Sequence, residues 1–247
     1  MYEEPFRWTE AVSSRHSYVQ EKLKKAFPVF AIPFNEGAFL FAIGPQSGKV
    51  YEIYDRIAMG GMGHPADIEK MRMTLLDMSH LEGFNRSVQD VVLGRLLQFG
   101  LAPALKQNFE EVMRAPYLVQ IALVEVDRRG NPKFFRVNYD GHWETFSNGT
   151  VISGNSKLVS LVEKRLGEVN FSELPLSEAL VESCKIWKEG MGEIENEENE
   201  IPKTLKQALE DWTLETAVLN HKTARKTIVR TLTKSEMDQL KVACDAL

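Results

Sequence analysis

Helical spacing followed by apolar runs at the start of the chain predicts a helix and then a β-hairpin. Residues 9–25 contain no glycine or proline, and their apolar positions recur every three or four residues, as on one face of a helix. Residues 27–34 and 38–43 are rich in phenylalanine and aliphatic side chains. The residues between them, 35–37, read Asn-Glu-Gly, which is typical of a turn. We therefore expect a leading helix over 9–25 and two paired strands.

Residues 48–63 are the stretch around which we expect the chain to be organised. Apolar and polar positions alternate up to the charged pair at 55–56, and three glycines close the stretch at 60, 61 and 63. The alternation predicts two short strands joined by a turn, and the glycines indicate that another backbone comes close. Pro65 suits the first turn of a helix, which we expect to end near Gly83.

The remaining pattern alternates between strands and helices. A possible capping box at Ser87 and Asp90 predicts a helix with a buried stripe formed by Val88, Val91, Val92, Leu96 and Phe99. We then expect strands over 118–126 and 133–139, a third near Trp143, a continuation of that sheet at 150–153, helices over 157–166 and from Pro175, a hairpin of 213–219 with 227–232, and a last helix capped by Thr233 and Glu236. Strand clusters that alternate with helix pairs favour an α+β fold of four layers, with two sheets between two helical layers.

Composition narrows the class of protein. The chain has 247 residues and a formal net charge of -5, so it fits one domain and lacks the basic footprint of a nucleic-acid binder. No signal-peptide pattern and no long apolar segment occur, from which we expect a cytoplasmic protein without a membrane contact. Its two cysteines, Cys184 and Cys244, fit a reducing compartment and are expected to be buried core residues. We expect an acidic surface loop over 189–204, because six of residues 189–200 are glutamate.

Several stretches resemble catalytic or binding motifs, but a structural role explains each of them better. The stretch 44–49 resembles a phosphate-binding loop, but its glycine spacing is short and a strand follows it instead of a helix. His64 has no second metal ligand at a suitable spacing, so a solvated or capping role is favoured and no metal is expected. No serine lies in a nucleophile elbow. Asp55 and Arg56 point to opposite faces if the strand continues, which favours a surface or interface role.

The motifs along the chain resemble the proteasome subunit family, especially the bacterial α-type subunits of the 20S core. The segments that carry the resemblance are 49–58, Gly63, 81–84, 116–119, 123–126, 135–141 and 214–219. They follow one another in order over nearly the whole chain. The resemblance implies the αββα sandwich of the N-terminal-nucleophile hydrolases, the same layers that the apolar pattern predicts.

The resemblance also implies that this chain alone is not an enzyme. Active members, the β-type subunits, use an N-terminal threonine helped by an aspartate and a lysine. The matching positions here are about Ala26, about Ile43 and Lys49, so only the lysine is present. Residues 1–25 would moreover cover such a site. We therefore expect no catalytic residue and no cofactor.

The family's α-type subunits form seven-membered rings at the ends of a barrel of β subunits, and the resemblance implies the same partners here. Their first helix, matched by 9–25, packs against the neighbouring subunit, while the segment before it, 1–8, would gate the pore for protein substrates. The gate residues would be Tyr2, Glu3, Glu4, Pro5, Phe6 and Arg7. Pockets between α subunits receive the C-terminal tails of ring-shaped ATPases or other activators. Lys49 matches the lysine that pairs with the tail carboxylate, Gly63 matches a pocket glycine, and His64 lies beside it.

Two other functions remain open for the same fold. One is a self-processed amidohydrolase whose N-terminal stretch is removed as a propeptide. The other is a homo-oligomeric scaffold without a β partner. A new N-terminal Ser, Thr or Cys in the purified chain would favour the first of these, and the absence of a threonine-nucleophile partner would favour the second.

Overall fold

Two antiparallel sheets form the centre of the molecule. The computed structural model describes residues 4–192, 202 and 204–245. In this part of the chain one sheet has the strand order β10-β9-β2-β1-β8 and the other the order β3-β4-β5-β6-β7. The strands are β1 Val29–Phe34, β2 Gly37–Gly44, β3 Val50–Tyr54, β4 Ile57–Gly63, β5 Val119–Val126, β6 Pro132–Val137, β7 Trp143–Phe146, β8 Thr150–Ile152, β9 Thr213–Asn220 and β10 Val229–Arg230.

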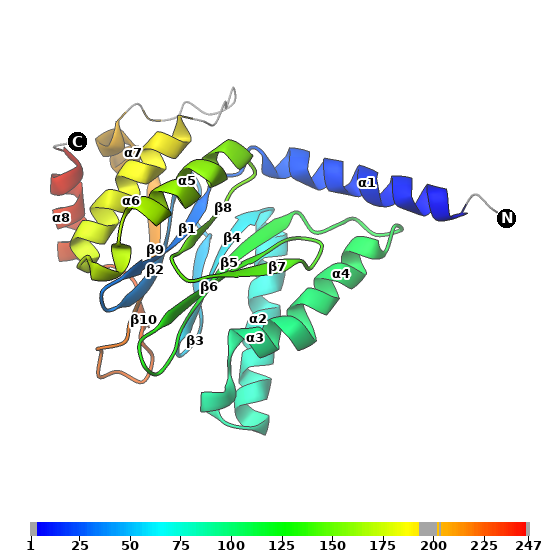
Figure 1. Cartoon of the computed structure of the whole chain (residues 1–247), viewed down its shortest axis with the longest axis horizontal. Helices are drawn as coiled ribbons and strands as arrows, with labels where there is room; N and C mark the ends of the chain where they lie inside the picture. The colour runs from blue at the N-terminus through cyan, green and yellow to red at the C-terminus, as the bar shows by residue number, and fades with distance from the viewer. Residues whose placement is uncertain (1–3, 193–201, 203, 246–247) are drawn as a thin grey trace.

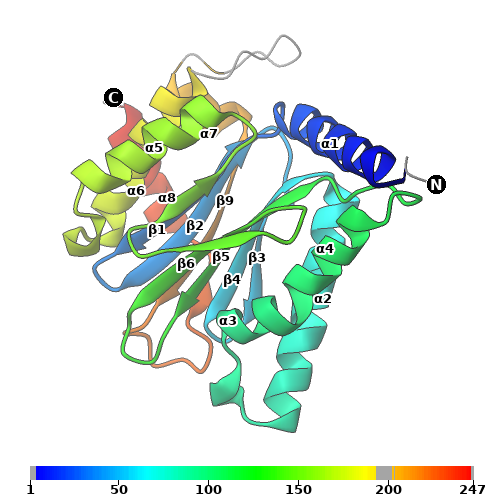
Figure 2. The same cartoon turned by 45° about the vertical axis from the view of Figure 1, so that its right-hand side comes forward.

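Helices cover the outer face of each sheet (Figure 1). Helices α5 to α8 lie on the sheet that contains β1, and helices α2 to α4 lie on the other (Figure 2). The helices are α1 Glu4–Leu23, α2 Pro65–Asn85, α3 Leu93–Leu96, α4 Ala102–Glu110, α5 Ser156–Glu168, α6 Leu176–Met191, α7 Leu205–Asp211 and α8 Lys234–Asp245. The expected α+β four-layer sandwich is confirmed.

Strand β2 shows why this sequence forms layers. All of its residues are buried, because the strand has a core on both faces. Phe39, Phe41 and Ile43 face the helices α5 to α8, whereas Leu40 and its small neighbours face the second sheet. Successive side chains of a strand point to opposite faces, so the run 38–43 separates large residues for one core from smaller ones for the other.

Local patterns were predicted well. The hairpin β1–β2 pairs Phe34 with Gly37, as the turn at 35–37 indicated. The stretch 48–63 forms β3 and β4 with a turn between them, and α2 begins at Pro65. The last hairpin is present as the pairing of β9 with β10. The last helix is capped as expected, since Glu236 accepts a hydrogen bond from the backbone N–H of Thr233 at 2.8 Å.

Other predictions need correction. The strand at 150–153 is β8, which pairs with β1 and so belongs to the opposite sheet from β7. Ser87 caps a 3-10 turn over Val88–Asp90 instead of the expected helix. Irregular helix follows, with a π-helical turn at Leu97–Leu101. Val88 and Phe99, expected in a buried stripe, are 42% and 70% exposed, because the break at 91–92 changes the helix phase. Helix α7 was not predicted.

The expected boundaries at the two polar segments also shift. Helix α1 begins at Glu4, although 1–8 was expected to be a loose segment, and it ends at Leu23 instead of residue 25. Pro5 is compatible with this start, because the first turn of a helix needs no N–H donor there. Of the acidic loop expected over 189–204, residues 189–191 belong to α6, and residues 193–201 and 203 lie outside the described part of the chain.

Candidate functional site

The turn between β2 and β3 holds Lys49 at one end of the sandwich. Gly48 has a φ of 90°, which a glycine adopts without strain, and Tyr51 donates a hydrogen bond from its hydroxyl to the Gly48 carbonyl at 2.6 Å. The backbone N–H groups of Lys49 and Val50 both donate to Oε2 of Glu215 on β9, at 2.9 and 3.1 Å. One carboxylate from a distant part of the chain thus fixes the backbone from which Lys49 projects.

The Lys49 side chain runs along Phe27, just before β1. Its Nζ donates to the Phe27 carbonyl at 3.2 Å and lies 5.2 Å from the centre of the Phe27 ring. Burial lowers the pKa of Lys49 to about 8, and the negative charge of Glu215 opposes this shift. Among the described residues the Phe27 carbonyl is the one acceptor for this ammonium, which can donate three hydrogen bonds. The group can therefore still bind an acceptor.

Lys49 and Glu215 are two charged groups that are each only partly hydrogen-bonded. Its Oε2 accepts the two backbone N–H groups, whereas its Oε1 is buried and has no hydrogen-bond partner among the described residues. A partly buried ammonium and a partly buried carboxylate that do not bond each other cost folding free energy. Such groups are more often kept for binding than for stability.

The two other positions of a hydrolytic centre hold apolar residues. Ala26 lies in the turn after α1, where its N–H donates to the Leu23 carbonyl at 3.0 Å. Ile43 is fully buried in the core against α5 to α8. Lys49 thus reaches the start of β1, as the resemblance implied, but neither a nucleophile nor a carboxylate stands at the matching positions.

Gly63 and His64 lie where β4 ends and α2 begins. Gly63 has a φ of 127°, and a Cβ placed there would lie 2.0 Å from the Leu118 carbonyl oxygen and 3.1 Å from the Leu23 side chain. The backbone of this chain therefore already requires glycine here. His64 is exposed, and its Nδ1 accepts a hydrogen bond from the N–H of Ala66 at 3.2 Å. It is the N-cap of α2, in line with the capping role that the sequence favoured.

Lys49 and Gly63 both lie against the same short segment. Lys49 contacts Phe27, and Gly63 lies beside Leu23, so the two residues flank the turn that leads from α1 into β1. The structure thus groups them around residues 23–27, with His64 next to Gly63 on the surface.

Helix α1 projects from this end of the sandwich (Figure 1), and Arg15 joins it to the end of α4. The guanidinium of Arg15 donates to backbone carbonyls at the end of α4 and just after it: Asn108 at 3.0 Å, Phe109 at 2.9 Å, Val112 at 3.4 Å and Arg114 at 2.6 Å. These carbonyls have no helical partner of their own, and a cation is favoured at a helix C-terminus. The His16 ring adds a 3.0 Å contact from Nδ1 to the Tyr139 hydroxyl.

Of the expected gate, only part can be placed. Tyr2 and Glu3 lie outside the described residues. Glu4, Pro5, Phe6 and Arg7 form the first turn of α1, at the end that points away from the sandwich (Figure 2).

Sequence reasoning missed Arg15, Phe27 and Glu215. Nothing in the spacing of Arg15 sets it apart from the exposed residues of α1, because its partners are backbone carbonyls almost a hundred positions away. Glu215 was part of the motif at 214–219, and its acidic side chain, the one charged residue of a predicted strand, was a usable signal.

The described residues contain no group of three or more His, Cys, Asp or Glu that could hold a metal ion. Of the helices that the structure describes, none combines the length and the apolar character needed to cross a membrane.

Comparison with known proteins gives one consistent family. The family model described as proteasome subunit matches residues 40–201. The proteasome subunit alpha of Mycolicibacterium vanbaalenii is 27% identical over 236 residues, which cover 94% of this chain and 87% of that protein. The proteasome subunit alpha of Actinosynnema mirum is 26% identical over 224 residues, or 90% and 81%. That of Rhodococcus opacus is 26% identical over 156 residues, or 61% and 60%.

Proposed function

The chain belongs to the proteasome subunit family, and from this premise we propose that it works as an α-type subunit in the outer ring of a 20S core particle. The α-type relatives along most of the chain are the observation that carries the proposal. Such subunits are the non-catalytic ones of the particle, and they assemble with other proteasome subunits.

The residues at the positions of a hydrolytic centre support the non-catalytic role. A threonine peptidase needs a free amine and a hydroxyl on its first residue. Here α1 precedes β1, and Ala26 and Phe27 lie in the turn that connects the helix to the strand. Lys49 keeps the position of the catalytic lysine, yet its ammonium contacts the Phe27 backbone carbonyl. The β partners would therefore supply the nucleophile, in the cytoplasm where we place the particle.

The test of the proposal is co-expression with a threonine-nucleophile β subunit. We expect the two chains to copurify in a particle that shows seven-fold rings by electron microscopy. The intact mass of this chain should correspond to a polypeptide that starts at Met1 or at the next residue. The particle with the native β subunit should hydrolyse peptides. Replacing the threonine nucleophile of the β subunit should abolish this hydrolysis. A chain that loses its first residues to expose Ser, Thr or Cys, or that forms a homo-oligomer indifferent to the β subunit, would contradict the assignment.

Lys49, Gly63 and His64 form the proposed docking site for the C-terminal tail of a ring-shaped ATPase or another activator. The support is chemical. Lys49 has unused donor capacity in a partly buried position, and a terminal carboxylate is the ligand that most favours its charged form. His64 is exposed next to Gly63, and the backbone of Gly63 lies beside Leu23, at the same turn that Lys49 contacts.

The first residues, Tyr2 to Arg7, form the proposed gate. Deleting residues 1–8 should raise basal hydrolysis of short peptides by the assembled particle several-fold, because substrates would no longer wait for an activator to open the pore. The measurement is the rate without activator, with the rate on the full-length particle as reference. An unchanged basal rate in a particle of normal mass would show that these residues do not obstruct the pore.

A further inference from the structure

The two cysteines of the chain, far apart in sequence, meet in the outer helical layer. Cys184 lies in the middle of α6 and Cys244 in the last turn of α8. Each is only 1% exposed, and both belong to the core between these helices and the sheet of β1. Their thiols are hydrogen-bonded to each other. The sequence indicated two unrelated core residues, whereas the structure makes them a pair.

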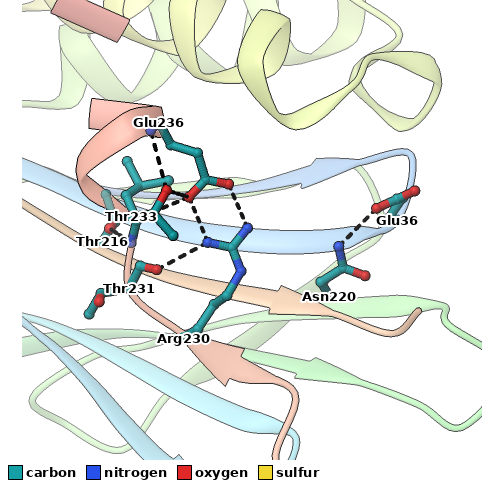
Figure 3. A network of polar contacts seen from close by, with 8 residues as sticks. Glu36, Thr216, Asn220, Arg230, Thr231, Thr233 and Glu236 are labelled. Carbon is teal, nitrogen blue, oxygen red and sulfur yellow. Dashed lines mark hydrogen bonds and ion pairs between the residues drawn. The ribbon is translucent and has the colours of Figure 1, made fainter. Parts of the chain in front are cut away.

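The other end of α8 is held by charge. The guanidinium of Arg230 donates to both carboxylate oxygens of Glu236, at 2.8 and 2.7 Å (Figure 3). The same carboxylate accepts hydrogen bonds from the N–H and the hydroxyl of Thr233. The hydrogen bond to Arg230 lowers the pKa of Glu236 to about 2, despite its partial burial, so this anchor persists through the neutral range. Helix α8 is therefore fixed firmly at its first turn.

The last turn of α8 has no comparable polar anchor among the contacts described. Leu240 and Cys244 pack into the core, while Val242 on the outer side is 72% exposed. A helix turn that lacks such an anchor opens more easily than the anchored start of the same helix. Cys244 is thus the thiol that such opening brings to the solvent first, and its hydrogen-bond partner Cys184 belongs to the same core cluster.

We propose that Cys184 and Cys244 are a modification site, a dithiol that hydrogen peroxide converts to a disulfide that joins α8 to α6. The Cys244 thiolate attacks one peroxide oxygen, the O–O bond breaks, and a sulfenic acid forms as hydroxide leaves and takes a proton. Cys184 then attacks the sulfenic sulfur, the S–S bond forms, and the hydroxyl leaves as a second water. In total, two thiols and one peroxide give one disulfide and two waters.

The packing of the last turn of α8 on the core determines how readily the disulfide forms. The hydrogen bond to Cys244 and burial raise the pKa of the Cys184 thiol well above its usual range. Since the thiolate is the reactive form, the pair stays reduced while α8 is closed and reacts when its last turn opens. The bond would close a loop from α6 to the end of α8 that includes α7 and β9, and a loop of this length restricts the unfolded chain strongly.

The test uses the reduced full-length chain with and without hydrogen peroxide under native conditions. We expect peptide mapping to show one cross-linked peptide that joins Cys184 to Cys244, with the loss of two hydrogens. The thermal midpoint should rise by about 5 °C or more and return after reduction with a thiol. Mapping also separates this change from oxidation of the nine methionines.

The matched control is Cys244→Ala treated identically. It retains Cys184 and all methionines, so its midpoint should not rise with peroxide. Sulfinic acid at either cysteine of the native chain, disulfide-linked dimers as the main product, or two thiols that remain unchanged would each overturn the proposal. This inference does not depend on the assignment as a ring subunit.

Discussion

Replacing Lys49 by methionine should reduce activator-stimulated degradation by the assembled particle about tenfold to a hundredfold, with ring assembly intact. The substitution removes the cation proposed to bind the tail carboxylate, and a charge-assisted hydrogen bond of this kind contributes about 1.5–3 kcal/mol. The measurement is the rate of protein degradation with the activator below its saturating concentration, divided by the rate without it. Lys24→Ala is the matched control, because Lys24 is exposed and pairs with Glu21 one turn earlier.

The same hypothesis predicts a dependence on pH. Because the pKa of Lys49 is about 8 in the free subunit, tail docking should weaken as the pH rises above that value and the ammonium loses its proton. A bound carboxylate would raise this pKa, so the decline should begin at a higher pH when the activator is in excess. Stimulation that does not change between pH 7 and pH 9.5 would contradict the assignment of Lys49.

The stability of the Lys49→Met variant distinguishes a loss of tail docking from a loss of folded structure. The pKa of Lys49 is lowered on folding, from about 10.4 in an unfolded chain, so the unfolded state holds more protons between these values. The contribution of Lys49 to stability therefore increases as the pH rises from about 8 to about 10, which means that the charged lysine costs stability at pH 7. Lys49→Met should consequently unfold at an equal or higher temperature than the native chain at pH 7. A clear decrease would show that the lysine serves the fold.

Replacing Arg15 by alanine should release α1 and lower the free energy of unfolding by about 3 kcal/mol. Arg15 is 9% exposed and its guanidinium donates to backbone carbonyls at the end of α4, so the change removes several charge-assisted hydrogen bonds at once. Hydrogen exchange of the α1 amides should become faster, because Arg15 joins the helix to the end of α4 through several hydrogen bonds at once.

Two variants sharpen that experiment. Lys22→Ala changes an exposed residue of the same helix and should leave exchange in α1 unaffected. Arg15→Lys keeps the charge but lacks the planar set of donors, so it should restore only part of the protection. If α1 is the ring-building element, Arg15→Ala should also favour single subunits over rings in native mass measurements. Slow exchange in Arg15→Ala would mean that packing alone holds the helix.

Local patterns were sufficient to predict much of this fold. The hairpin β1–β2 and the stretch from β3 to α2 were recovered because adjacent segments pair with each other across short polar turns, at 35–36 and at 55–56. The phase change at 91–92 defeated the prediction of a continuous helix, because tertiary packing overrides a nearly regular apolar spacing. The short α7 gave no separate signal beside the acidic segment.

The site was predictable only through the family motifs. Lys49 was found by its position in a motif, whereas its contact with Phe27 and its backbone support from Glu215 depend on strands that are distant in sequence. The pairing of β8 with β1 was missed for the same reason. Apolar alternation indicates that a residue is in a sheet but not which sheet, since both inner faces bury similar side chains.

The central place of β2 has a consequence for how the protein is made. Its partner on one side, β1, comes directly before it, but its partner on the other side is β9, near the end of the chain. During synthesis the ribosome therefore releases the phenylalanine-rich strand β2, with one hydrogen-bonding edge unpaired, long before β9 is made. An unpaired apolar edge of this kind invites association with other chains. Production of this subunit should accordingly depend on chaperones that shield the nascent chain until β9 has emerged.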